Sequence, residues 1–323
     1  MDLPSSLGSA ILTPMVLAFL LGILATLVKS DLKFPEGLYV GLTIYLLFAI
    51  GLKGGVKLSA ISLSEFLKPA MIAILMCTCI PIISYLLLRY IGKFSIINAS
   101  AIAAHYGSVS AVTFSEATAY MEFMQIPFEG YMASLLAIME VPAILVAIFI
   151  AKYLDSKEET NWKKILHELF TGKGNILLIG GMTIGILSGK KGMEQISPLF
   201  EAPFRGVLVL FLLEVGMITG KKLYDLKSVG FFLVAFGIIM PFIHAIIGIY
   251  LSHKIGLSMG GSVIFGTLCA SASYIAAPAA VRLALPEASP SYYLTASLAI
   301  TFPFNVVFGL PIYLNFAKSI YGV

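Results

Sequence analysis

Apolar stretches long enough to cross a membrane recur along the whole chain, and short clusters of charge separate them. About 20 residues of helix span the hydrocarbon core of a bilayer. Only 12% of the residues are charged, against about 25% in an average soluble domain, and 59% are apolar. We therefore expect an all-α polytopic membrane protein that has no room for a soluble catalytic domain.

Hydropathy predicts ten transmembrane helices, several of them short or interrupted by Gly or Pro. Their expected ranges are 10–28, 35–52, 69–89, 97–121, 130–152, 175–189, 203–220, 228–252, 258–285 and 291–317. The longest polar stretch, Lys152 to Gly174, divides them into two groups of five. We therefore predict a first repeat over residues 1–153, a linker over 154–174 and a second repeat over 175–323.

The two halves share short motifs in the same order and at a nearly constant offset. These pairs are IGLKGGVKL with VGMITGKKL, Pro81 with Pro241, Ser108-Val109-Ser110 with Ser271-Ala272-Ser273, and Tyr131 with Tyr293. Chance identities between apolar segments would not keep one offset, so the pattern favours an internal duplication. An odd number of crossings per copy makes the two copies inverted repeats, which is an architecture of transporters.

The distribution of basic residues predicts the orientation in the membrane, because Lys and Arg favour cytoplasmic loops. With both termini outside, the inner side holds 13 of the 21 Lys and Arg residues. We therefore expect a multi-pass protein of the plasma (inner) membrane, with both termini outside and the linker 154–174 in the cytoplasm.

The fourth and ninth helices form a pair of interrupted helices at matching places in the two halves, which is typical of a transport site. Gly107 and Pro278 are suitable helix breakers. A helix broken inside the membrane offers free N–H groups and a positive dipole end to an anion, and its freed carbonyls can bind sodium. The hydroxyls that could take part are those of Ser108, Ser110, Thr113, Ser271 and Ser273.

Close packing of membrane helices through small residues is the alternative explanation of both motifs. It accounts well for the alanines, and less well for paired hydroxyls at repeat-related positions beside a proline.

Acidic residues within the apolar segments are a second indication of function, because a charge inside the bilayer is costly and normally faces a cavity or a partner. Glu116, Glu140 and Glu214 are of this kind. Glu116 and Glu140 are candidates to bind a cation or carry a proton, and an internal hydrogen-bond partner is the alternative for each. Asn305 could be an amide ligand, although an interhelical hydrogen bond is its commoner role.

His105 and His244 do not form a metal set, because no second ligand follows on the same helix face. We expect them to be structural, and His105 is the better candidate for function because it opens the break. HExxH, GxSxG and P-loop motifs do not occur. The sequence therefore predicts no transition metal, no cofactor and no ATP-driven pump.

Over nearly its whole length the chain resembles the sodium-dependent bicarbonate transporter family of cyanobacteria. The stretches that carry this resemblance are IGLKGGV (50–56), GSVSAVT (107–113), IMEVPAILVAI (138–148), FRG (204–206), SMGG (258–261), the ASAS stretch with Pro278 and Arg282, and LPEASPSYY (285–293). The resemblance implies ten helices in two inverted repeats, a scaffold domain, a mobile transport domain, a homotrimer, coupled uptake of sodium and bicarbonate, and a PII-like cytoplasmic regulator.

The resemblance also implies that the two breaks hold the substrates. The anion would lie against Gly107, Ser108, Val109, Ser110, Ser271, Ala272, Ser273 and Tyr274, and sodium near Ser110, Thr113, Glu116, Glu140, Ser273 and Asn305. The family pattern has an Asp where this chain has Tyr274 and a small apolar residue where it has Glu116. An acid lost at one break and gained at the other suggests a relocated cation site or a proton site.

We therefore expect a secondary active symporter that takes up bicarbonate with sodium by alternating access. A sodium- or proton-coupled carrier of another small organic anion on the same fold is the alternative. An intramembrane enzyme would need a catalytic constellation, and the helix cores contain no Asp.

Overall fold

The computed structural model describes residues 12–155 and 161–323, and this part of the chain is helical, without strands. Six of its helices are long and apolar enough to cross a membrane. The predicted all-α membrane architecture is confirmed at this level. The expected start of the first helix at residue 10 and residues 156–160 of the linker lie outside the described residues.

Most predicted segments correspond to helices whose bounds differ by a few residues, and both expected broken helices are divided in two. The segment expected over 175–189 is longer, because α9 continues past a kink at Gly189 to Phe200. In chain order the elements are α2 (Pro14–Leu27), α3 (Glu36–Leu58), α4 (Leu63–Leu86) with the π-helix η1 (Leu87–Ile91), α5 (Ile96–Gly107), α6 (Ala111–Phe123), α7 (Met132–Leu154), α8 (Trp162–Thr171), α9 (Lys173–Phe200), α10 (Phe204–Leu223), α11 (Leu226–Lys254), α12 (Met259–Ala270), α13 (Ala277–Ala284), α14 (Pro290–Leu294), η2 (Thr295–Thr301), α15 (Phe302–Phe304), η3 (Asn305–Gly309) and α16 (Leu310–Tyr321).

The linker contains a short helix, α8, that hydropathy did not predict. The Asn161 side chain accepts from the N–H of Lys164 at 3.0 Å and so caps its first turn. Ile165 and Leu169 lie on one face and are buried, whereas most of the intervening side chains are exposed. Hydropathy does not detect this helix, because its apolar face is narrow and its length is well below that of a membrane span.

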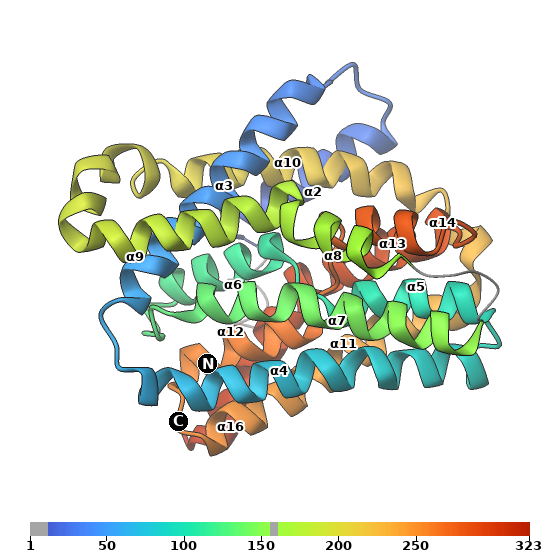
Figure 1. Ribbon diagram of the computed structural model, residues 1–323. Helices are drawn as coiled ribbons and strands as arrows, with labels where there is room; N and C mark the ends of the chain where they lie inside the picture. Colours follow the sequence, from blue (N-terminus) through green and yellow to red (C-terminus); the bar gives the residue numbers. More distant parts are fainter. Residues whose placement is uncertain (1–11, 156–160) are drawn as a thin grey trace.

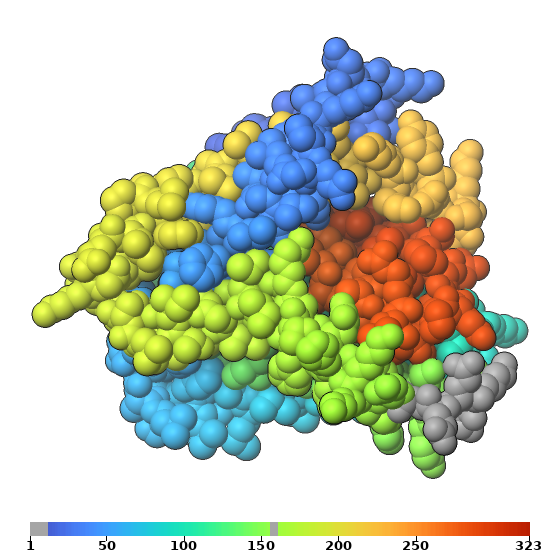
Figure 2. Space-filling model, turned by 45° about the horizontal axis from the view of Figure 1, so that its top comes forward, coloured from blue at the N-terminus to red at the C-terminus, as the bar shows by residue number. Residues whose placement is uncertain are grey.

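Four helices, α2, α3, α9 and α10, pack in two close pairs, α3 with α9 and α10 with α2. We call these four helices the scaffold group; they lie together along one side of the molecule (Figure 1). In the space-filling view the blue α2–α3 segments and the yellow-green α9 segment lie against each other, beside the red α13–α14 segment (Figure 2).

Glycines at the repeated motif make the two close pairs possible. A Cβ on Gly51 would lie 2.5 Å from the carbonyl oxygen of Leu178 in α9, and one on Gly55 would lie 2.0 Å from that of Met182. A Cβ on Gly216, which matches Gly51 in the repeated motif, would lie 2.1 Å from the carbonyl oxygen of Phe19 in α2. Small residues let membrane helices approach this closely, and backbone packing then holds them together. The motif shared by the two halves therefore occupies a similar close helix contact in both.

The other helices pack mainly among themselves, with α4, α5 and α7 in mutual contact and α12 between α11 and α16. We call them the second group. Two buried core clusters run through the molecule, and the larger joins both groups through residues such as Phe19, Leu46, Val112 and Phe302. The interface between the groups also includes a hydrogen bond from the Thr219 hydroxyl in α10 to the carbonyl oxygen of Leu298 at 3.1 Å.

Alanine at Gly55 is predicted to destabilise the protein, because its Cβ cannot be placed without moving α9 away from α3. Overpacking of this kind costs about 1–3 kcal/mol. Gly41→Ala on the same helix is the matched control, because no atom of the described residues lies within 4 Å of its Cβ position. There alanine should be neutral or stabilising by up to about 1 kcal/mol through helix propensity. Melting temperatures of the purified proteins in detergent measure both, and equal shifts would contradict the prediction.

Candidate functional site

The first break separates α5 from α6 at Ser108, Val109 and Ser110. Ser108 and Ser110 have extended backbone, with ψ of 151° and 115°. The Ser110 hydroxyl accepts from the N–H of Thr113 at 3.2 Å and so caps α6. Gly107 ends α5 against Pro81, whose ring atoms lie 2.7–2.9 Å from where a glycine Cβ would be. The break thus forms where the sequence predicted it, and Gly107 permits its close contact with α4.

The second break separates α12 from α13 at residues 271–276. The hydroxyl of Ser271 donates to the carbonyl oxygen of Leu268 at 2.8 Å, and the Ser273 hydroxyl accepts from the N–H of Ala277 at 3.3 Å. Pro278 lies in the first turn of α13, where its missing N–H costs no helical hydrogen bond. Pro278 therefore begins the second half-helix, and the break itself precedes it.

The two breaks cross and hydrogen-bond to each other. The N–H of Ser110 donates to the Ser271 hydroxyl at 2.9 Å, and the N–H of Ser273 donates to the carbonyl oxygen of His105 at 2.8 Å. Ser108, Ser110, Ser271 and Ser273 are all at most 4% exposed. The structure therefore brings the candidate residues of both halves into one buried site.

The His105 side chain reinforces this crossing, a role that the sequence did not predict. Its Nδ1 lies 2.6 Å from the carbonyl oxygen of Ser273, which can only accept, so Nδ1 carries the proton and donates. The ring stacks on Tyr293 at a centroid distance of 4.5 Å. His105 is thus a positioning residue that ties the end of α5 to the second break.

Two carboxyl groups lie buried near the crossing. Glu116 in α6 is 2% exposed and Glu140 in α7 is 5% exposed, and one oxygen of each has no hydrogen-bond partner in the part of the chain that the structure describes. The main-chain oxygen of Glu140 accepts from the Ser108 hydroxyl at 2.9 Å, which fixes α7 beside the first break. A buried carboxyl oxygen without a donor is costly, so each acid is suited to a proton or a cation. Thr113, in the first turn of α6, is 1% exposed.

Asn305 uses both ends of its amide within the protein. Its Nδ2 donates to the carbonyl oxygen of Ala270 at 2.8 Å, and its Oδ1 accepts from the Tyr313 hydroxyl at 2.7 Å. Ala270 is the last residue of α12, so Asn305 satisfies a carbonyl that the helix end leaves free. Asn305 therefore supports the end of α12, and its Oδ1 keeps a second lone pair beside the second break.

Val109, Ala272 and Tyr274 complete the walls of the two breaks and are at most 8% exposed. The Tyr274 ring makes an edge contact with Phe302 at a centroid distance of 5.7 Å. Its hydroxyl lies close to the Ser110 side chain of the first break. A phenol thus brings a hydroxyl to the place where the resemblance led us to expect a carboxylate.

A water-accessible cavity lies beside the crossing, between the scaffold group and α6. Its volume is about 710 Å³, and Phe114, Thr118 and Glu122 of α6 form part of its wall. A void of about 10 Å³, bounded by Ala111, Ser115 and Ile275, lies next to the breaks and shares Ile50 with the cavity. A space of that size holds about one water. Among the described residues, only this small space is found between the cavity and the breaks on the side of Ile50.

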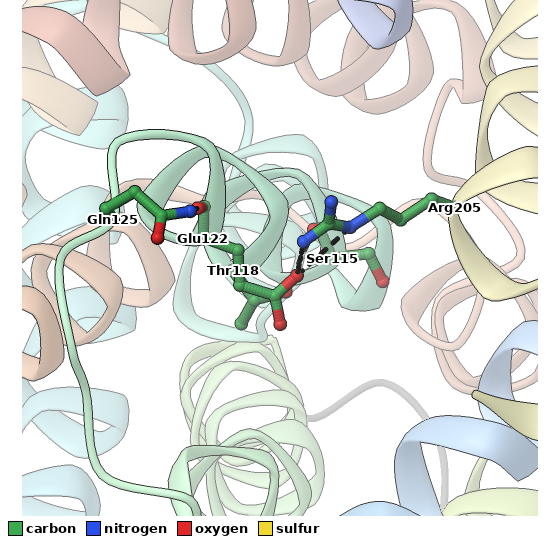
Figure 3. A network of polar contacts seen from close by, with 5 residues as sticks. All are labelled: Ser115, Thr118, Glu122, Gln125 and Arg205. Atoms are coloured by element: carbon green, nitrogen blue, oxygen red, sulfur yellow. Dashed lines mark hydrogen bonds and ion pairs between the residues drawn. The ribbon is translucent and has the colours of Figure 1, made fainter. Parts of the chain in front are cut away.

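An ion pair spans the cavity and links the two helix groups. Arg205, at the start of α10, donates through Nε and Nη2 to Oε2 of Glu122 in α6, at 3.2 and 2.6 Å (Figure 3). The two side chains are 58% and 46% exposed. An ion pair this exposed contributes at most about 1 kcal/mol, so it can break at little cost.

Among the described residues no three His, Cys, Asp or Glu side chains come together in a way that would hold a metal ion. The hydroxyls, carbonyls and lone carboxyls around the breaks are instead the oxygen donors that suit a hard cation.

Comparison with protein families matches residues 14–318 to the Na⁺-dependent bicarbonate transporter superfamily. This match covers nearly the whole chain and confirms the resemblance seen in the motifs. No curated protein matches the sequence significantly.

Ser271→Ala is predicted to destabilise the crossing, because it leaves the buried N–H of Ser110 without an acceptor. An unsatisfied buried donor costs about 1–3 kcal/mol. Ser100→Ala in α5 is the control, because its buried hydroxyl has no hydrogen-bond partner in residues 12–155 and 161–323 and its removal should be neutral or stabilising. Melting temperatures in detergent test the pair, and a Ser271→Ala variant as stable as Ser100→Ala would refute the assigned hydrogen bond.

Proposed function

The chain belongs to the Na⁺-dependent bicarbonate transporter superfamily, and from this premise we propose that it is a sodium-coupled symporter for bicarbonate. Membership of a transporter family identifies a multi-pass carrier of the membrane and not an enzyme. The observation that carries the proposal is the buried crossing of two broken helices, whose hydroxyls and main-chain groups bond to each other.

The anion is proposed to bind where α6 and α13 begin. Both helices start at the crossing, so their first N–H groups and positive dipole ends lie next to the breaks. Backbone donors of this kind can replace the water that bicarbonate loses on entering the protein. Gly107, Ser108, Val109 and Ser110 would line one side of the anion, and residues 271–274 the other.

Sodium is proposed to bind beside Glu116, with Ser110, Thr113 and Ser273 as neighbouring oxygen donors. A cation would offset the cost of a buried carboxyl oxygen that has no donor among the described residues. Glu140 is the second carboxyl that a cation or proton could neutralise. We propose Asn305 as a support for this region, because both groups of its amide are already bonded.

Coupling is proposed to follow from ordering of the breaks. An anion and a cation that each stabilise the same arrangement of the half-helices favour each other's binding, which is a population shift. The second group, which carries both breaks, would then move against the scaffold group. The exposed Arg205–Glu122 pair and the narrow void beside Ile50 lie on the surface that would slide.

The arrangement of the chain in the membrane is part of the same proposal. We propose inverted repeats over 1–153 and 175–323, since Gly51 and Gly216, which match in the repeated motif, both lie against a backbone carbonyl of a neighbouring helix. Both termini would lie outside, with 154–174 in the cytoplasm. A homotrimer and a PII-like regulator follow from the resemblance, and mass measurement of the purified protein in lipid discs tests the trimer.

Uptake of labelled bicarbonate into proteoliposomes tests the proposal. We expect an inward sodium gradient to drive accumulation above a control without sodium, after correction for diffusion of carbon dioxide. Uptake that ignores sodium would refute the coupling. Uptake of another small organic anion in place of bicarbonate would favour the alternative substrate. This is the main alternative to bicarbonate, because Tyr274 brings a hydroxyl where the family pattern has a carboxylate.

Glu116→Gln is predicted to weaken sodium binding, because the amide keeps the size of the side chain and removes its charge. We expect the sodium concentration for half-maximal uptake to rise about tenfold, which corresponds to about 1.4 kcal/mol. Glu194→Gln on the exposed face of α9 is the control and should leave it unchanged. Sodium and pH dependences of uptake that both stay as in the wild type would rule out a role of Glu116 in coupling.

A further inference from the structure

The side chains that line the 710 Å³ cavity include positive charges that no ion pair among the described residues neutralises. Its wall includes three basic side chains, Lys53, Lys57 and Arg205, and two acids, Glu122 and Glu201. Arg205 is paired with Glu122, whereas neither lysine forms an ion pair with any described residue. Two lysines therefore share the cavity with a single uncommitted acid.

The lysines are held on the cavity wall by their own surroundings. They lie one helical turn apart on α3, so they share a helix face. The Lys53 ammonium lies 4.0 Å from the centre of the Phe204 ring, a cation–π contact. The Lys57 side chain packs on Gly130, where an added Cβ would come within 2.7 Å of its Cδ. Both charges therefore face the space between the two helix groups.

In the second half of the chain, the lysine that matches Lys57 has an acidic partner. Lys222 occupies the place of Lys57 in the repeated motif and forms an ion pair with Asp225 at 2.9 Å. At the corresponding distance along the chain from Lys57 stands Ala60. Like charges one turn apart repel each other, so the unpaired lysines gain from an anion that enters the cavity.

We propose that Lys53 and Lys57, with Arg205 opposite, form a recruiting site for small oxyanions in the 710 Å³ cavity, which we call the vestibule. This recruiting site is separate from the site at the broken helices. The vestibule adjoins the first turns of α6 through Phe114 and Thr118, so an anion held there lies on the path to the breaks. Its volume leaves the anion hydrated, and attraction between partly solvated charges raises the local anion concentration. The proposal deepens the proposed function and rests on it for the identity of the transported anion.

Lys53→Gln and Lys57→Gln are predicted to raise the KM for bicarbonate by about three- to tenfold each and to leave the maximal rate nearly unchanged. Lys191→Gln is the matched control, because this exposed lysine lies outside the cavity. Uptake is measured in phosphatidylcholine vesicles at about 50 mM and 300 mM total salt. The differences between variants and wild type should shrink at high salt, because screening weakens the attraction.

A structural role of the lysines would change the maximal rate and would not depend on salt, which would overturn the proposal. Lysines that bind lipid phosphate would affect uptake only when anionic lipid is added, and that outcome would overturn it too. Kinetics equal to those of the control variant would do the same.

A binding measurement keeps this test independent of the transported anion. The melting temperature of the purified protein is followed with sodium bicarbonate, formate and nitrate at constant sodium and ionic strength. We expect these anions to stabilise the wild type more than the Lys53→Gln/Lys57→Gln double variant, since a ligand stabilises the state that binds it. Equal stabilisation would overturn the recruiting site even if uptake works. A difference without bicarbonate uptake would keep the site and reject the proposed function.

Discussion

Where a helix is interrupted inside a membrane protein, its unpaired N–H and C=O groups must form hydrogen bonds within the protein, because the bilayer core offers no partners. The two breaks meet this requirement by supplying partners to each other. The N–H of Ser110 uses a hydroxyl of the second break, and the N–H of Ser273 uses a carbonyl of α5. Neither break could keep its geometry alone, since each would lose a donor or an acceptor that the other provides. The site is therefore one structural unit built from both halves.

The same requirement explains why the scaffold group is held differently. Its helices are continuous or only kinked, so they need few polar partners and can pack through glycine with backbones in contact. Packing of that kind resists sliding within the group. The surface against the second group contains, besides the apolar contacts of the shared core, an exposed ion pair, a side-chain hydrogen bond from Thr219 and a small void. The ion pair can break at low cost, which fits the movement of the two groups that we propose.

Much of this arrangement could be predicted from the sequence. Apolar length, Gly107, Pro278 and the matched serines indicated the helices and the position of both breaks. The roles of individual side chains could not be predicted, because they depend on partners far away in the chain. The sequence marks Asn305 as a possible ligand, but it does not tell that Tyr313 and Ala270 bond to the two groups of its amide. His105 reads as a structural residue, yet its partner is Ser273 in the other half. Lys53 and Lys57 counted only toward orientation, since a sequence does not tell which charges are paired.

The charges that remain without partners differ in sign between the vestibule and the interior. Lys53 and Lys57 lie in the vestibule, where only Glu201 opposes them, whereas Glu116 and Glu140 lie buried near the crossing. Lone lysines favour entry of an anion, whereas an ionised carboxyl at Glu116 or Glu140 would repel the same anion as it approaches the breaks. A proton or a cation that neutralises these carboxyls would remove that repulsion. If sodium binds beside Glu116 as we propose, an anion gathered in the vestibule would advance to the half-helix N-termini more readily once sodium is bound.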